Sequence, residues 1–304
     1  MRYAPVPAGD RVKYASLPAT VVGLGDSAVI GKAREEMIRG IRGMLGRTLR
    51  LEKALPDESA IILGTVAALK SAAPALVVPK IGKDGFWLAT ASIRARRCIV
   101  IASSNERGVL YGVFAFLSKI ARGQGIAELN EVQQPYAPIR WVDQWDNLDG
   151  TIERGYGGPS IFFENDSVRS DLTRVSEYGR LLASVGIQGC AINNVNANPR
   201  VIQDTFLPQL ARVAEAFRPW GVQLSVSVDL SSPKKTGDLD TFDPLDPRVL
   251  EWWQKRIDAI YRLIPDFGGF VVKADSEERP GPSSYGRTPA DAANMLARTL
   301  KPYG

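Results

Sequence analysis

The chain has 304 residues, of which 45% are hydrophobic and 23% charged, a composition typical of a soluble globular protein with one or two domains. Its 38 basic and 33 acidic residues give a net charge of +5, and the basic residues are scattered, which argues against a nucleic-acid partner. The chain contains no histidine, which excludes Ser-His-Asp and Cys-His catalytic systems and the usual zinc sites. Acid–base chemistry must therefore come from carboxylates, lysine or tyrosine.

No apolar run approaches the roughly 18 residues of a membrane span. The N-terminal sequence MRYAPVPAGD also lacks the apolar core of a signal peptide. These features predict a cytoplasmic protein without a membrane partner. Cys98 and Cys190 each lie in an apolar, strand-like run, so we expect two buried free thiols rather than a disulfide.

Residues 1–135 predict a small N-terminal α/β domain, because strand-like runs are followed by helices with an apolar face. Gly23 and Gly25 are followed by the next glycine only at Gly31, the wrong spacing for a dinucleotide-binding turn. The predicted elements are strands at 19–22, 48–51 and 60–63, a hairpin of strands 86–90 and 98–102, a helix at 27–45 capped by Asp26 or Ser27, and a helix at 105–121 ended by Gly123.

The sequence QQPYAP at 133–138 predicts a stiff connector, because it holds two prolines within four positions. After it the pattern becomes strand, polar loop and helix, repeated four times. Thr288, Pro289 and Asp291 mark the start of the last helix as N-cap, first helical residue and first-turn acid. The predicted strands are at 139–143, 188–193, 222–228 and 270–272, and the helices at 171–185, 204–218, 247–264 and 288–300.

Four successive βα units with polar residues after each strand predict the first four units of a (β/α)8 TIM barrel over residues 139–304. A doubly wound sheet is the alternative, but it usually has a glycine-rich turn after its first strand. This chain has Trp145, Asp146, Asn147 and Asp149 there, which suit a sugar better. Because a barrel needs eight strands, we expect the chain to be a truncated part of a longer protein.

Charged residues gather after the strand at 270–272, where Lys273, Asp275, Glu277 and Arg279 follow closely. Charged groups at the end of a buried strand are typical of active sites, and carboxylate pKa values there can be raised by burial or lowered by a nearby lysine. The alternative is a solvated loop in which Lys273 forms an ion pair with Asp275.

Two further residues have plain structural alternatives. Trp145 could pack in the core instead of contacting a ligand. Glu278 has no assigned role and is expected to lie on the surface.

Three segments resemble glycoside hydrolase family 67, the α-glucuronidases of xylan breakdown. They are WDNLDGTIERGYGG at 145–158, AINNVNA at 191–197 and VVKADSEERPGPSSYGRT at 271–288. The resemblance continues through TFDPLDP at 241–247 and IPDFGGF at 264–270, and into the N-terminal domain through RYAP and ERGVLYGVFAFL.

The resemblance implies an N-terminal α/β domain, a central (β/α)8 barrel and a C-terminal helical region. It implies removal of α-1,2-linked (4-O-methyl)glucuronic acid from glucuronoxylan-derived oligosaccharides, with inversion and without a cofactor or metal. Glu277 matches the family's general acid, Lys273 the lysine beside the uronic acid, and Trp145 a tryptophan that shapes the sugar pocket. Whether the full-length protein forms a homodimer stays open.

Two departures from the family pattern matter. The family's catalytic base lies on later barrel strands, so the chain alone is expected to have little or no turnover. Pro289 also stands where the family usually has histidine. If the chain is active by itself, its base must be among Asp143, Asp146, Asp149, Asp229 and Asp275. The alternatives are a non-catalytic half-barrel that binds carbohydrate or assembles with a second polypeptide, and a relative acting on another sugar.

Overall fold

The computed structural model describes residues 2–277 and 279–304, which form two compact units. Unit 1 comprises residues 2–140 with the segments Gly179–Ile187 and Arg218–Gly221. Unit 2 comprises Trp141–Tyr178, Gln188–Phe217 and Val222–Gly304. The division falls after Arg140, and both short segments of unit 1 come from the range expected for the barrel. Glu278 lies outside the described residues.

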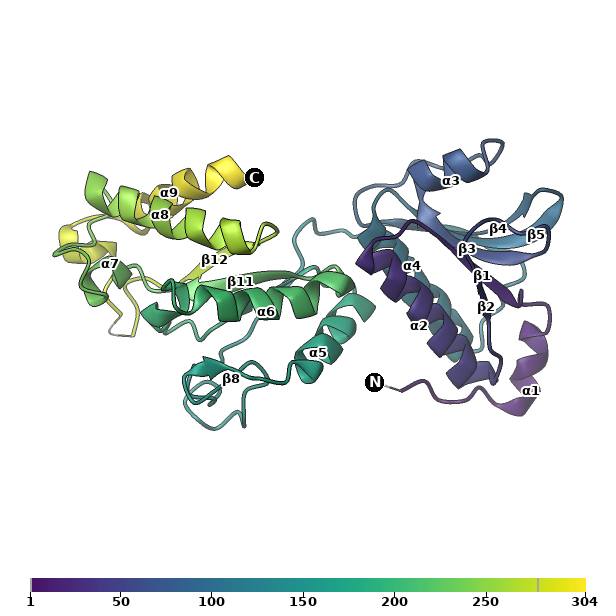
Figure 1. Cartoon of the computed structure of the whole chain (residues 1–304), viewed down its shortest axis with the longest axis horizontal. Helices are drawn as coiled ribbons and strands as arrows, with labels where there is room; N and C mark the ends of the chain where they lie inside the picture. Colours follow the sequence, from purple (N-terminus) through teal and green to yellow (C-terminus); the bar gives the residue numbers. More distant parts are fainter. Residues whose placement is uncertain (1, 278) are drawn as a thin grey trace. The chain divides into compact units, whose positions relative to one another are not determined.

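Unit 1 contains a six-stranded sheet in the order β2-β1-β3-β5-β4-β6 (Figure 1). The first four strands of this order are parallel, and β4 runs antiparallel to both of its neighbours. The predicted hairpin is confirmed, with Arg94 and Ala95 in the left-handed region at its turn. The strands are β1 (Thr20–Leu24), β2 (Arg50–Glu52), β3 (Ala60–Thr65), β4 (Phe86–Ile93), β5 (Arg96–Ser103) and β6 (Asn130–Gln133).

Two long helices of unit 1, α2 (Ala28–Leu45) and α4 (Glu106–Ala121), pack together on one face of this sheet (Figure 1). Ser27 caps α2 by accepting a hydrogen bond from the Ile30 amide at 3.2 Å, which decides between the two predicted caps. The helices approach closely at Gly40, where a Cβ atom would lie 2.6 Å from the Leu117 side chain. Both predicted helices are confirmed.

Three short elements of unit 1 were not predicted. They are α1 (Ala8–Arg11), which continues into a 3-10 turn at Val12–Tyr14, α3 (Val66–Ala72), and the edge strand β6. Leu69 of α3 is fully buried in a cluster with Val22, Ile62, Trp87 and Val100. The cluster fills the side of the sheet that α2 and α4 leave uncovered, so α3 completes the second layer of the unit.

A buried ion pair joins α2 to the segment Gly179–Ile187 inside unit 1. Arg180 Nε donates a hydrogen bond to Glu36 Oε2 at 2.8 Å, and a second guanidinium nitrogen pairs with Oε1. The two side chains are only 4% and 2% exposed. Tyr3 donates its hydroxyl to Glu36 at 2.6 Å, and the Arg180 guanidinium lies over the rings of Tyr3 and Phe114. Burial and the Glu36 charge raise the pKa of Tyr3.

Unit 2 contains a four-stranded parallel sheet in the order β7-β10-β11-β12. Among the strands of this sheet, β10, β11 and β12 each pair with the one that comes before it in the chain. Ala191 of β10 pairs with Asp143 of β7 on one side and Ser225 of β11 on the other. The order never reverses, which confirms a barrel-like half sheet over the doubly wound alternative. The strands are β7 (Trp141–Asp143), β10 (Gly189–Ile192), β11 (Gln223–Val228) and β12 (Gly269–Val272).

A helix follows each of these strands, as predicted. The helices are α5 (Thr173–Ser184), whose last residues belong to unit 1, α6 (Leu207–Phe217), α8 (Pro247–Leu263) and α9 (Pro289–Leu300). Thr288 and Asp291 form the expected capping box of α9. A small hairpin of β8 (Phe163–Glu164) and β9 (Ser167–Val168) and the one-turn helix α7 (Ser232–Lys235) were not predicted.

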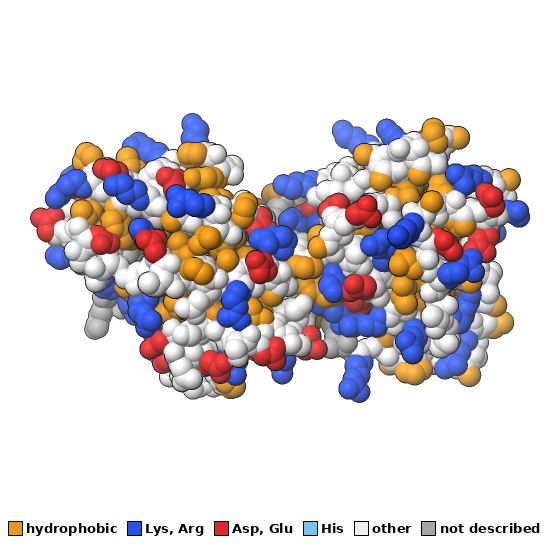
Figure 2. Space-filling model, in the orientation of Figure 1, with side chains coloured by type: hydrophobic (Ala, Val, Ile, Leu, Met, Phe, Trp, Pro, Cys, Tyr) orange, Lys and Arg blue, Asp and Glu red, His pale blue; other side chains and the backbone are white. Residues whose placement is uncertain are grey.

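Short 3-10 turns fill the remaining connections, at Pro199–Ile202, Arg218–Trp220, Pro282–Tyr285 and Lys301–Tyr303. Cys98 and Cys190 are both buried and free, as predicted. None of the helices in the described part of the chain is long and apolar enough to cross a membrane. On the face shown in Figure 2, basic side chains are spread over the surface with acidic ones between them.

Candidate active site

Polar side chains gather at the carboxyl ends of the unit 2 strands. Asp143 is the last residue of β7, and Asn193, Asp229 and Lys273 directly follow β10, β11 and β12. Because the four strands are parallel, these ends lie along one edge of the sheet, where α/β barrels place their active sites.

Lys273 and Glu277 form the charged centre of this edge. The Lys273 ammonium forms an ion pair with Glu277 Oε2 and donates a hydrogen bond to Asn196 Oδ1 at 2.9 Å. The Lys273 side chain is 16% exposed and that of Glu277 is 54% exposed. Glu277 has a φ of 48°, a left-handed backbone conformation that turns the loop back toward the end of β12. The alternative, an ion pair of Lys273 with Asp275, is therefore wrong.

Asp275 instead holds the loop closed. Its carboxylate accepts hydrogen bonds from the hydroxyl and the backbone amide of Ser283. Gly281 packs directly against it, because a Cβ atom there would lie 2.6 Å from the Asp275 amide nitrogen. The loop that presents Glu277 is thus fixed by contacts between its own two ends.

The electrostatic setting of Glu277 differs from the one expected for a desolvated acid. The hydrogen bond from Lys273 and its charge lower the pKa of Glu277 below the ordinary range, and Arg154 adds to this effect. Arg154 Nη2 lies 3.4 Å from Glu277 Oε1. Of the two directions that the sequence left open, the lowered pKa therefore applies, because the side chain is half exposed and faces two cations.

We expect Lys273→Ala to raise the pKa of Glu277 toward the ordinary value of about 4.3, since the main group that stabilises the carboxylate is removed. Carbon-13 NMR titration of the glutamate carboxyl groups in the 304-residue chain measures this shift. Arg154→Ala serves as the graded control and should raise the same pKa by less. An unchanged pKa in Lys273→Ala would show that the ion pair does not form in solution.

Trp145 lies just beyond β7 and does not pack in the core. Its side chain is 42% exposed, and its indole N–H donates a hydrogen bond to Asp143 Oδ2 at 3.0 Å. The core-packing alternative for Trp145 is therefore wrong. Burial raises the pKa of Asp143, although the hydrogen bond from Trp145 opposes the shift.

The loop at 145–158 extends from the Trp145 side of the sheet to Glu277 at the other. The Glu153 amide donates to the Trp145 carbonyl at 2.8 Å, and Asn194 donates to the Glu153 carbonyl at 3.3 Å. These hydrogen bonds fix the loop at Glu153, so that the next residue, Arg154, lies beside Glu277. The structure thus brings Lys273 and Glu277 together directly, and connects Trp145 to them through this loop.

The other carboxylates proposed as bases have mostly structural partners. Asp149 caps the turn at Thr151, and Asp229 accepts hydrogen bonds from Ser231 and pairs with Lys235. Burial raises the pKa of Asp146, and within the described part of the chain its Oδ2 atom has no hydrogen-bond partner. Asp143 is exposed and is the carboxylate that hydrogen-bonds Trp145.

Asn196 and Arg154 were missed as site residues. Both lie inside the segments AINNVNA and WDNLDGTIERGYGG, but neither has a spacing signal that relates it to Lys273 or Glu277. Among the described residues, no group of three or more histidine, cysteine, aspartate or glutamate side chains could hold a metal ion.

The fold and this edge define a class: an α/β domain joined to a parallel (β/α) half-barrel with charged residues at its strand ends, the architecture of many glycosidases. Solved structures with the same fold include a 4-O-methyl-α-glucuronidase of family GH115 with specificity for decorated arabinogalactans (TM-score 0.60, 12% identity, covering 100% of this chain and 40% of that one). A β-hexosaminidase of Streptomyces plicatus is also similar (TM-score 0.54, 11% identity, covering 94% and 60%). At these identities the likeness shows the fold alone.

The sequence comparisons are more specific. The glycosyl hydrolase family 67 N-terminus matches residues 1–116, and the family 67 middle domain matches residues 119–304. A probable alpha-glucuronidase A of Aspergillus fumigatus is 45% identical over 308 residues, and an alpha-glucuronidase of Hypocrea jecorina is 43% identical over 319 residues. Both alignments include 100% of this chain, which spans 36% and 37% of these relatives. The chain belongs to glycosyl hydrolase family 67.

Proposed function

We propose that the chain supplies the N-terminal domain and acid-bearing half of an α-glucuronidase. The reaction is removal of α-1,2-linked (4-O-methyl)glucuronic acid from xylo-oligosaccharides with inversion. The observation that supports it most is the Lys273–Glu277 ion pair at the end of β12, in which the Lys273 ammonium also donates a hydrogen bond to Asn196. The pair combines a carboxylic acid with a cation suited to a substrate carboxylate.

In this proposal Glu277 protonates the leaving glycosidic oxygen. An inverting enzyme also needs a carboxylate base roughly 6.5–9.5 Å away to activate water on the opposite face of the sugar. The proposal places that base outside these 304 residues. The exposed indole of Trp145 would stack on the C–H face of the terminal sugar.

Lys273 links substrate binding to the protonation of Glu277. In the unliganded chain Lys273 keeps Glu277 ionised, which is the wrong state for a general acid. A substrate carboxylate that binds Lys273 competes with Glu277 for the ammonium and adds a negative charge nearby. Both changes raise the pKa of Glu277, so the uronic acid itself favours the protonated acid that the reaction needs.

A second function has support from the same observation. A half-exposed glutamate with a lowered pKa, next to an exposed tryptophan, suits carbohydrate binding without hydrolysis. In that case the chain binds uronic acid and has no turnover in any longer polypeptide.

The proposal is tested by measuring binding of an aldouronic xylo-oligosaccharide and release of glucuronic acid from it. The two proteins compared are the 304-residue chain and a longer polypeptide that contains this chain followed by four more βα units. We expect binding by both and release only by the longer one. Binding by both without release would favour the carbohydrate-binding function. Release by the 304-residue chain would place the base within it, with Asp143 the first candidate, and would refute the assignment of the base to a later strand.

A further inference from the structure

A hollow of about 450 Å³ lies within unit 1, and all the residues that line it belong to this unit. It is lined by one face of α4, the segment that follows β6, and the turn that follows α5. Its volume falls within the range of small-molecule sites. Its lining combines aromatic side chains, amides and cations, and the site proposed above uses none of these residues.

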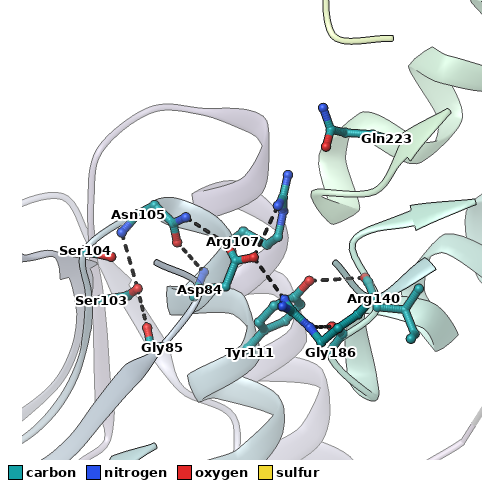
Figure 3. Close-up of polar contacts among 12 residues, drawn as sticks. Asp84, Gly85, Ser103, Ser104, Asn105, Arg107, Tyr111, Arg140, Gly186 and Gln223 are labelled. Atoms are coloured by element: carbon teal, nitrogen blue, oxygen red, sulfur yellow. Dashed lines mark hydrogen bonds and ion pairs between the residues drawn. The ribbon is translucent and has the colours of Figure 1, made fainter. Parts of the chain in front are cut away.

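One wall of the hollow is a fixed ionic network. Asp84 is 2% exposed and accepts hydrogen bonds from Asn105 at 2.8 Å and from Arg140 Nη2 at 2.9 Å, with Arg107 at 3.4 Å (Figure 3). Arg140 also donates to the carbonyls of Gly186 and Ala137. Burial alone raises the pKa of Asp84, but the hydrogen bonds from Asn105 and Arg140 and the Arg107 charge lower it overall. This wall is therefore charged, and the protein itself supplies the donors that bind the Asp84 carboxylate.

A second group of lining side chains has hydrogen-bonding capacity that the protein does not use. Arg122 contacts only the Ser118 carbonyl, through Nε at 3.3 Å, and no carboxylate of the described residues pairs with it. The side-chain amides of Gln133 and Gln134 have no hydrogen-bond partner in the described part of the chain. Lys119, which also lines the hollow, is by contrast paired with Glu131.

Aromatic side chains form the apolar part of the hollow. Phe86, Tyr111 and Phe114 line it with the small part of each residue that is exposed, 7–9%, and Tyr111 is held in place by donating its hydroxyl to the Ile187 carbonyl at 3.1 Å. A small apolar wall next to free amides suits a sugar ring, whose C–H groups can contact the wall while its hydroxyls bind the amides. The free guanidinium of Arg122 adds a site for a carboxylate.

We propose that this hollow binds a uronic acid residue of an acidic carbohydrate. Arg122 would pair with the carboxylate, and the amides of Gln133 and Gln134 would hydrogen-bond the hydroxyls. The first 140 residues carry an excess of basic over acidic side chains, which favours an anionic ligand. The site would hold the chain on an acidic polysaccharide independently of any hydrolysis. It does not depend on the function proposed for the strand ends of unit 2.

Titration of the 304-residue chain, labelled with nitrogen-15 in its glutamine side chains, tests the proposal. All titrations are made with the Trp145→Ala variant, because this substitution weakens sugar binding at the strand ends of unit 2. The probes are glucuronic acid, glucose and an aldouronic xylotriose, at constant ionic strength. We expect the Gln133 and Gln134 amide signals to shift with both acidic sugars, and glucose to bind at least about tenfold more weakly because it lacks the carboxylate.

Arg122→Ala is expected to weaken glucuronic acid binding by about tenfold or more. Arg96→Ala, an exposed arginine at the start of β5, is the matched control and should change nothing. Tighter binding of the xylotriose than of free glucuronic acid identifies the polysaccharide as the source of the uronic acid, and equal affinities identify the free sugar acid.

Three results would overturn the proposal. Equal binding of glucose and glucuronic acid would remove the role of Arg122, and displacement by sulfate at equal concentration would show a non-specific anion site. Loss of the amide shifts in a longer polypeptide that carries this chain would show that another part of that protein fills the hollow.

Discussion

Replacing Glu277 with alanine is expected to lower turnover on aldouronic xylo-oligosaccharides by roughly 10²- to 10⁴-fold, the usual contribution of a general acid. The measurement uses a longer polypeptide that carries this chain and releases glucuronic acid. The loss should be much smaller on a glucuronide with a 4-nitrophenol leaving group, which departs without protonation. Steady-state kcat values on the two substrates give the comparison directly.

Glu251 provides the matched control for this experiment. Like Glu277 it pairs with a lysine four residues away, Lys255, and both of these side chains are 68% exposed on α8. Glu251→Ala should leave both rates unchanged. Equal losses on the two substrates in Glu277→Ala would refute the general-acid role and leave Glu277 as a residue that positions Lys273.

Glu36→Ala is expected to reduce the free energy of unfolding by about 3–5 kcal/mol, because it leaves the buried Arg180 charge without its carboxylate. The neighbouring Glu35, 67% exposed and paired with Lys32, is the control, and Glu35→Ala should cost less than about 1 kcal/mol. Urea unfolding of the 304-residue chain, followed by circular dichroism, measures both values.

A double variant separates the ion pair from a simple packing defect. Combining Glu36→Ala with Arg180→Met removes both charges and should recover much of the lost stability, since no unpaired ion remains buried. Additive losses in the double variant would mean that Glu36 and Arg180 stabilise unit 1 independently, contrary to the geometry of the pair.

The elements predicted from the sequence are those with strong local signals. The helix at 27–45 has an apolar face and a serine cap, and the strands of the half-barrel are short apolar runs bounded by polar loops. The elements that were missed have weak local signals. α3 and α7 are short, and β6 has the polar sequence NEVQ, which forms a strand only because β4 offers it an edge.

The candidate site was predicted in part. The resemblance pointed to Lys273 and Glu277, and the structure brings their side chains together. The sequence left the direction of the Glu277 pKa shift open, because that direction depends on how far Glu277 is exposed and on Arg154, which is 123 residues away along the chain. The Glu36–Arg180 pair was missed for the same reason, since contacts across 144 residues leave no local pattern.

The strand order of unit 2 also bears on how the chain is made. Since β7, β10, β11 and β12 pair in the order in which they are synthesised, each new strand finds its partner already present when it leaves the ribosome. No later strand is inserted between two strands that are already paired. Each pairing joins two strands that are separated in the chain by the loop and helix of a single βα unit. The half-barrel can therefore assemble during translation, from its N-terminal strand onward.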